Sequence, residues 1–250
     1  VLLGSGLVAV VLITRNPGTS AIILGAVGAG LIAWFVYWEG RVSLPVVDLT
    51  LFYHPTFAAG ATMIALQNVA MYATLFQIPF LLAALIGASP SESGIALLAM
   101  SGGMVLCAPV GGMLSERLGV RATVAVGALL SIIGMCLLIV LSSVPSLVLL
   151  TLCVLMFGCG LGLSHGPIQA AALSAAPPEH SGMASGVIAT LRYIGGVAGI
   201  AVLGLLLASH PADADITIHR TAFVVYAVSL VLTLCLSLAM PRVLSDANEV

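Results

Sequence analysis

The sequence contains no lysine, and charged residues of any kind are scarce. Arginines and acidic residues make up 6% of the 250 residues, whereas 61% are hydrophobic and the mean hydropathy is +1.24. This composition lies far outside that of soluble globular proteins, so we expect an integral membrane protein. Because the net charge is -2 and the seven arginines are scattered, the sequence has no basic patch, and we expect no nucleic-acid partner.

The sequence also lacks the motifs of several kinds of reactive site. It has no glycine-rich phosphate loop with lysine, no paired aspartate motif and no two-histidine haem helix, and no apolar run carries an Asp or Glu at its centre. The five cysteines lie inside apolar runs without CxxC spacing, which is typical of small packed side chains rather than metal ligands. We therefore expect no enzyme activity, no cofactor and no bound metal.

Long apolar runs fill most of the sequence and predict eight membrane spans, the first of them cut short. A bilayer core of about 30 Å requires roughly 20 residues at about 1.5 Å per residue. Turn signals such as Asn16-Pro17-Gly18, Val144-Pro145 and His210-Pro211 separate the runs. The predicted spans are approximately 1–14, 20–38, 55–85, 92–114, 121–142, 146–172, 183–208 and 221–240.

The placement of the arginines predicts how these spans are oriented. One side carries Arg41, Arg117, Arg121 and Arg242, with Arg192 near it, and the other carries only Arg15 and Arg220. Cytoplasmic loops have an excess of basic residues. We therefore expect a multi-pass protein of the cell membrane whose segment 111–121 and C-terminus are cytoplasmic.

The segment 111–121 is a short polar hinge between two apolar runs. Glu116 precedes the start of a predicted helix, where a carboxylate is favourable, and Arg117 lies near the end of the preceding helix, where a cation is favourable. The hinge resembles the cytoplasmic loop signature of the major facilitator superfamily, with Glu116 in place of Asp and Val120 in place of a basic residue. The residues that match are Gly112, Leu114, Ser115, Glu116, Arg117, Gly119 and Arg121.

Two further segments resemble the same family. Residues 39–57, with Glu39, Arg41 and Pro45, are similar to the connector of its fourteen-span drug:proton antiporter branch, although an amphipathic surface linker is the alternative. Residues 177–199 are similar to the pattern that enters the penultimate span of that branch. Its two glycine pairs, Gly182 with Gly186 and Gly195 with Gly199, predict two faces of close helix packing.

The resemblance implies an all-α membrane helix bundle that is the C-terminal part of a larger protein. Residues 1–50 would be two inserted spans and a connector, and residues 51–250 the second six-helix half. The missing N-terminal half would carry the proton-coupling acid. The implied function is proton-coupled efflux of small amphipathic compounds or drugs by alternating access, with small-molecule substrates, protons and the lipid bilayer as partners. The alternatives are export of another metabolite, lipid or siderophore, and a membrane scaffold that transports nothing.

Amides in the third run are candidate cavity residues. Gln67 and Asn68 lie about 18 Å from the start of this run, close to the membrane midplane, and Tyr72 and Gln77 follow. Amides at this depth are costly unless they face a partner or a wet cavity. We interpret these residues as the lining of a transport cavity, with hydrogen bonding between helices as the alternative.

Three polar residues in later runs are further candidates. His165, with Gln169 beside it, lies near the inner face and could carry protons, although a hydrogen-bonded structural histidine is the alternative. Arg192 lies about 14 Å into its run and needs a partner or must extend to the inner face. We expect Arg192 either to take part in gating or substrate contact or to form a structural pair. We interpret Asp213, Asp215 and His219 as a solvated outer-loop cluster.

The hinge is the candidate gating element. We expect Gly112, Glu116, Arg117, Gly119 and Arg121 to form a latch at the inner face, joined in gating by Arg192. In this hypothesis Glu116 stabilises the outward-open state through charge and helix-end contacts that break when the inner gate opens.

Overall fold

The computed structural model describes residue 34 and residues 49–208 and 216–240. The two predicted spans at 1–14 and 20–38 and the connector that follows them lie outside the described residues, apart from Trp34 and the last residues of the connector. Asp213, Asp215 and the C-terminal segment also lie outside them. The division of the chain at residue 50 therefore stays a prediction.

The described part of the chain is all-α, as predicted. Six helices in it are long and apolar enough to cross a membrane. Their positions agree with the six predicted spans from residue 55 onward. The helices are α3 (Pro55–Ile86), α4 (Pro90–Leu118), α5 (Val120–Leu141), α6 (Leu147–Ser174), α7 (Ser181–Ala208) and α8 (Ile216–Ala239), with short 3-10 helices at Leu49–Tyr53 and Pro178–His180.

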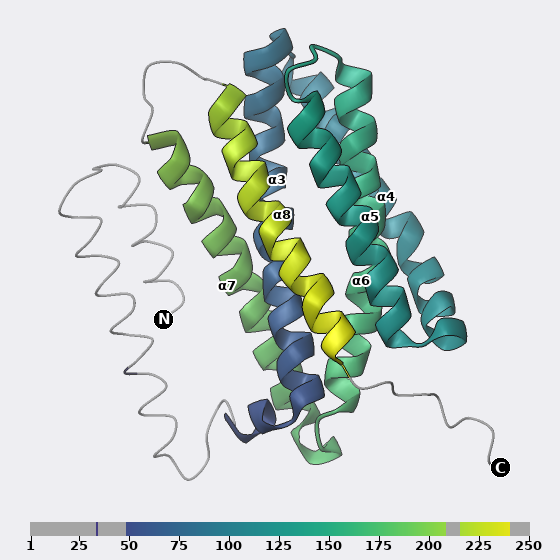
Figure 1. The fold of residues 1–250 in the computed structure, drawn as a ribbon. Coiled ribbons are helices and arrows are strands. Elements are labelled where there is room, and N and C mark those ends of the chain that lie inside the picture. Colours follow the sequence, from purple (N-terminus) through teal and green to yellow (C-terminus); the bar gives the residue numbers. More distant parts are fainter. Residues whose placement is uncertain (1–33, 35–48, 209–215, 241–250) are drawn as a thin grey trace.

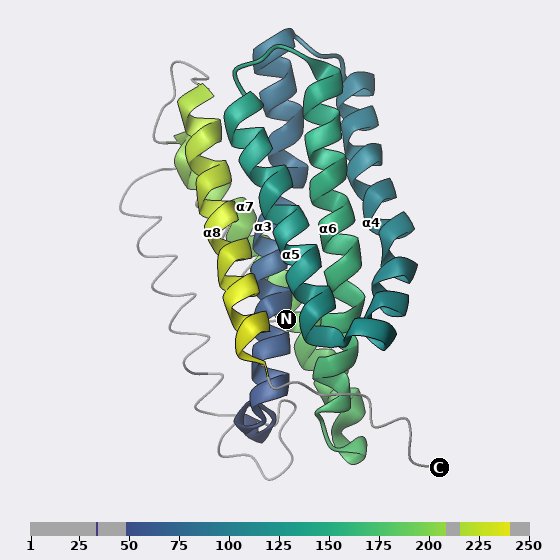
Figure 2. The same ribbon diagram turned by 45° about the vertical axis from the view of Figure 1, so that its right-hand side comes forward.

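The six helices run alternately up and down as one bundle (Figure 1). The start of α3, the α4–α5 turn, the α6–α7 connection and the end of α8 lie at the lower end of the view. Helix α6 packs closely against α4 and α5, and α3 packs closely against α7 and α8. Contacts of α3 with α6 and of α5 with α8 join these two groups of helices. Figure 2 shows the same arrangement of helices from another side.

The sequence marks several helix ends clearly. Proline stands at the first positions of α3 and α4, where its missing N–H group costs nothing. Gly87, with a φ of 62°, ends α3 in the left-handed conformation that glycine adopts without strain. At the start of α4, Ser89 and Glu92 cap each other's backbone N–H groups in a reciprocal capping box.

The predicted hinge is shorter in the structure than in the prediction. Helix α4 continues through Leu118, so the charged residues lie on its last turn, and Gly119 alone separates it from α5. Gly119 has a φ of 82°, which explains why glycine is needed there. Gly112, which we expected in the turn, is an exposed helical residue with open space beside it. Helix α4 extends past Gly112 because no residue between Gly112 and Gly119 breaks it.

Glycines allow α6 to approach its neighbours backbone to backbone. Gly158 and Gly162 lie so close to α4 that a Cβ on either would collide with the carbonyl oxygen of Met100 or Met104. Gly160, on a different side of α6, is equally close to α5. Close packing of this kind is what holds helices together in a lipid solvent, where there is no hydrophobic drive between them.

The two glycine pairs predicted to pack α7 behave differently. Gly195 and Gly199 lie against the backbone of α3, as predicted. Gly182 and Gly186 have no atom within reach of an added Cβ, so the prediction of a packing face there was wrong for contacts within the described residues. The reason is that both lie on the exposed face of the start of α7, whereas Ala184 and Val187 on its other face are buried in a cluster with residues of α3.

Candidate functional site

Four of the predicted polar residues come together where α3, α6 and α7 meet. They are Gln67 on α3, His165 and Gln169 on α6 and Arg192 on α7, and Ser164 on α6 joins them. We call these five residues the polar junction. Gln67 lies about 18 Å from the start of α3, and Arg192 about 17 Å from the start of α7, which places the junction at mid-depth in the bundle.

The hydrogen bonds of Gln67 have a defined direction. The Ser164 hydroxyl donates to the carbonyl oxygen of Gly160 at 2.9 Å, so its oxygen accepts from the Gln67 amide nitrogen at 2.8 Å. The Gln67 amide oxygen therefore faces Nδ1 of His165, 3.3 Å away, and Nδ1 must be the donor. This arrangement fixes a proton on Nδ1 and leaves Nε2 of His165 to face other groups.

Arg192 connects α7 to α6 at a place where these two helices make few direct contacts. Its Nη2 donates to the side-chain oxygen of Gln169 at 2.5 Å. Its Nε is buried and has no hydrogen-bond partner among the described residues. The guanidinium also lies close enough to His165 to interact with it electrostatically. Arg192 therefore has unused hydrogen-bonding capacity and a charge that a neutral amide does not balance.

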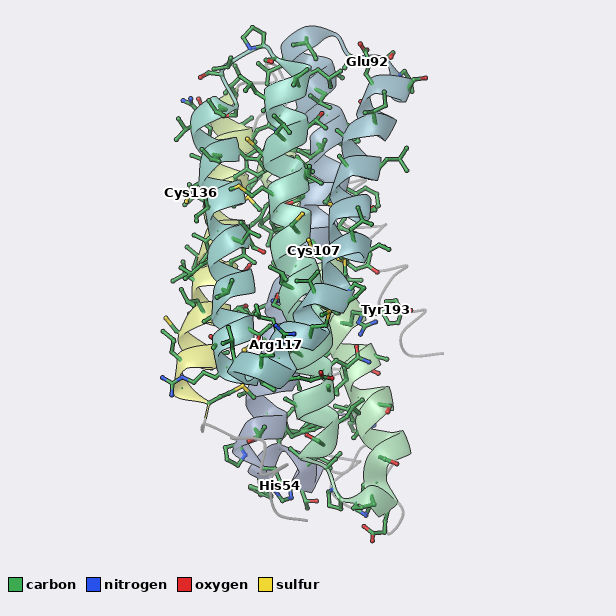
Figure 3. All side chains as sticks on the ribbon, turned by 90° about the vertical axis from the view of Figure 1, so that its right-hand side faces the viewer. His54, Glu92, Cys107, Arg117, Cys136 and Tyr193 are labelled. Carbon is green, nitrogen blue, oxygen red and sulfur yellow. The ribbon has the colours of Figure 1, made fainter. Side chains whose placement is uncertain are left out.

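The members of the junction differ in exposure. Gln67 and Ser164 are buried, whereas His165, Gln169 and Arg192 are half-buried. Two exposed residues, Gly166 on α6 and Tyr193 on α7, are their immediate neighbours in the chain. Figure 3 shows Tyr193 projecting away from the bundle. The junction therefore has an inner part that joins helices and an outer part that is open to a ligand or to another protein segment.

The remaining candidates on α3 lie apart from this junction or deeper in the bundle. Asn68 is fully buried, and its amide nitrogen donates to the carbonyl oxygen of Ile64 at 2.7 Å while its amide oxygen has no partner among the described residues. Tyr72 is half-buried, with its ring against Gly196 of α7. In this conformation Asn68 is closed off from any substrate, which could reach it only after the helices move apart.

Gln77 belongs to a separate contact nearer the upper end of the bundle. Its amide nitrogen lies 3.2 Å from Nδ1 of His219 on α8 and donates to the carbonyl oxygen of the same residue at 2.9 Å. Both residues are buried, so the interpretation of His219 as a solvated loop residue was wrong. The prediction failed because α8 begins at Ile216, five residues earlier than the apolar run, and carries His219 into the α3 interface.

The charged residues of the α4–α5 turn lie on the surface. Glu116 and Arg117 are exposed and Arg121 is half-buried, and among the described residues none of them has a hydrogen-bond or ion-pair partner. Figure 3 shows Arg117 and Glu92 at opposite ends of α4. The first turn of α5 has no side-chain cap and contains Arg121, so this helix end is electropositive and would attract a carboxylate.

Sequence reasoning missed two connections between elements. Ser164 was overlooked as the partner of Gln67, although it stands next to His165. Arg220 donates to the hydroxyls of Ser142 and Ser143 at 3.0 Å each, which ties α8 to the α5–α6 turn. Nothing in the local sequence marks such pairs, because their members are far apart in the chain. Within the described ranges, His, Cys, Asp and Glu side chains form no group of three that could hold a metal ion.

A family model described as Major Facilitator Superfamily matches residues 62–248, most of the chain. The chain belongs to this superfamily. Multidrug resistance protein Stp of Mycobacterium tuberculosis is 36% identical over 187 residues, which cover 74% of this chain and 34% of that protein. The tetracenomycin C resistance and export protein of Streptomyces glaucescens is 31% identical over 192 residues, covering 76% of this chain and 36% of that protein.

A solved structure has the same fold. The inward-open conformation of the xylose transporter XylE from E. coli aligns with a TM-score of 0.57 at 16% sequence identity, covering 77% of this chain and 48% of that one. At this identity the likeness concerns the fold alone. The chain spans between about a third and a half of the length of the curated relatives it matches. It is a multi-pass membrane protein of a transporter family.

Proposed function

We propose that the chain is the C-terminal part of a secondary active exporter that moves small amphipathic compounds, drugs among them, in exchange for protons. Residues 51–250 supply one six-helix half, residues 1–50 two additional spans, and a preceding segment the other half. The two halves rock against each other around a central site, as in alternating access. The C-terminus and the α4–α5 turn lie in the cytoplasm, because Arg117 and Arg121 are at that end of the bundle.

The single observation that carries this proposal is the polar junction. Five polar side chains meet at mid-depth in a bundle whose other buried side chains are mostly apolar, and three of the five are half-buried rather than sealed inside it. Polar groups at this depth in a membrane are costly and mark substrate or ion pathways. An apolar surround with a few placed polar groups suits amphipathic compounds.

Within this proposal the predicted site residues divide into three groups. The outer part of the junction, namely His165, Gln169 and Arg192, contacts substrate, and Tyr72 lies further along the same pathway. The buried amides Gln67 and Gln77 join α3 to α6 and α8, and these two residues and Asn68 become accessible only when the helices move. Glu116 and its neighbours at the α4–α5 turn act as the latch of the inner gate.

Dye efflux tests the proposal. The full-length protein is expressed in a bacterial strain deleted for its own efflux pumps, and the cells are loaded with Nile red, a neutral amphipathic dye, and then energised. We expect efflux that exceeds the empty-vector control and that a protonophore abolishes. Efflux that survives the protonophore would remove proton coupling from the proposal. An absence of efflux for Nile red and for a panel of other amphipathic dyes would favour the scaffold alternative.

A further inference from the structure

The charge of Arg192 is not balanced within the described part of the protein. A charged side chain at mid-membrane is costly unless it is paired. The carboxylates among the described residues are Glu92, Glu116 and Glu179, and none of them forms an ion pair with Arg192. Within the described ranges its one hydrogen bond is to Gln169, a neutral amide. The charge therefore requires an anion from outside these helices.

The hydrogen bonds of the guanidinium are only partly used within the described residues. Nη2 is used by Gln169, and Nε has no partner. Nε is buried, but Arg192 as a whole is only half-buried, so the side chain is not sealed inside the bundle. Guanidinium groups bind carboxylates through two parallel hydrogen bonds, which neutral groups cannot reproduce.

We propose that Arg192 binds an acidic group of the transported compound, so that the exporter prefers amphipathic molecules carrying a carboxylate. This inference rests on the proposed function and names the substrate class of the same site. Gln169 positions the guanidinium from one side. His165, held by Gln67 through Nδ1, presents Nε2 as a second polar contact for the substrate. The apolar part of the molecule lies against the surrounding helix surfaces.

Two probes that differ only in the acidic group test this inference. Pyrene butyrate is a carboxylate at neutral pH, and its methyl ester is neutral. Binding of each is measured by fluorescence anisotropy on the purified full-length protein. A hydrogen-bonded charge is worth about 1.5–3 kcal/mol, so we expect the butyrate to bind at least about tenfold more tightly than the ester.

Substitution of the arginine should remove this preference selectively. In Arg192→Gln we expect the butyrate to lose about tenfold or more in affinity while the ester changes by less than about twofold. Arg192→Lys keeps the charge but not the two-pronged geometry, and should retain part of the preference. Arg220→Gln is the matched control, because it removes the same charge at the upper end of the bundle and should leave the preference intact. Gel filtration of each variant checks that it is folded.

The outcomes separate the inference from the proposed function. Equal binding of the two probes by the wild type, or an equal loss for both in Arg192→Gln, would overturn the inference. The second result is the one expected if a carboxylate of the N-terminal half, rather than the substrate, pairs with Arg192. In either case protonophore-sensitive efflux of Nile red would still support the exporter. If Arg192→Gln does not fold, Arg192→Lys decides the matter. A preference for the butyrate over the ester that is reduced but not lost supports the inference, and an unchanged preference would overturn it.

Discussion

Glycine-mediated backbone contacts hold together the side of the bundle formed by α4, α5 and α6, whereas the junction of α3, α6 and α7 adds polar side-chain bridges to the backbone contact of Gly195 and Gly199 with α3. On the first side, glycines bring helix backbones into direct contact, and no side chain has to move for the helices to fit. At the junction, amide, hydroxyl, imidazole and guanidinium groups bridge the helices, and some of their hydrogen-bonding capacity is unused. From this difference we expect the first side to behave as a rigid frame and the junction to be the part that exchanges partners.

The largest expected effect comes from breaking the rigid frame. Gly158→Ala places a Cβ against the carbonyl oxygen of Met100, and neither backbone can yield without separating α4 from α6. Overpacking costs about 1–3 kcal/mol when side chains can adjust, and more when they cannot. We expect little folded protein by fluorescence-detected gel filtration. Gly102→Ala is the matched control, because it adds the same methyl group in open space on α4. Equal yields of the two variants would show that the α4–α6 contact is not rigid.

A smaller loss is expected from breaking the junction at its buried end. Gln67→Leu leaves Nδ1 of His165 without an acceptor and removes the donor to Ser164. Unpaired buried polar groups cost about 1–3 kcal/mol each. We expect a lower thermal unfolding temperature and slower Nile red efflux. Ser164→Ala should have a weaker effect, because the bond between His165 and Gln67 remains. If Gln67→Leu unfolds at the wild-type temperature, Gln67 does not hold these helices together.

The α4–α5 turn should affect turnover rather than stability. Glu116 is exposed and has no partner among the described residues, so Glu116→Ala removes no contact seen here. If the carboxylate stabilises the outward-open state by about 1 kcal/mol or more, efflux should fall by at least about fivefold while expression and probe binding stay unchanged. Glu179→Ala, an exposed carboxylate at the same end of the bundle, is the control. Unchanged efflux by Glu116→Ala would remove the latch from the mechanism.

The smallest effect is expected at the capping box of α4. Ser89→Ala deletes the hydroxyl that accepts from the Glu92 backbone N–H at 3.3 Å. Loss of an N-cap costs about 1 kcal/mol. We expect a slightly lower unfolding temperature and normal efflux, because the cap lies at the opposite end of α4 from the turn. A loss of efflux in this variant would mean that the upper end of α4 takes part in gating.

The sequence was sufficient to predict the number and order of the helices from residue 55 onward. Apolar runs of membrane length and proline and glycine at their ends are local signals, so they need no knowledge of tertiary contacts. The helical rise also predicts that Gln67 lies near mid-depth, but it predicts His165 and Gln169 near the inner face, whereas the structure brings them together with Gln67 and Arg192. What could not be predicted is that these four residues meet, since that depends on how α3, α6 and α7 are rotated.

Rotation about the helix axis also explains the errors. Gly182 and Gly186 have the spacing of a packing face, yet that face has no neighbour among the described residues. His219 was placed in a loop because polar residues precede it, although the helix had already begun. In a helix that is apolar all round, the sequence does not show which side faces a partner helix and which faces lipid.

Accessibility of the junction tests the central claim most directly. A full-length variant lacking the native cysteines receives one cysteine at Gln169, and labelling by a membrane-impermeant maleimide is followed with and without a saturating transported dye. We predict labelling that the dye slows several-fold, whereas a cysteine at the exposed Ser91 of the upper turn is labelled at the same rate in both conditions. Failure of the cysteine at position 169 to react in any condition, or reaction at a rate that the dye does not change, would contradict the placement of the junction on the substrate pathway.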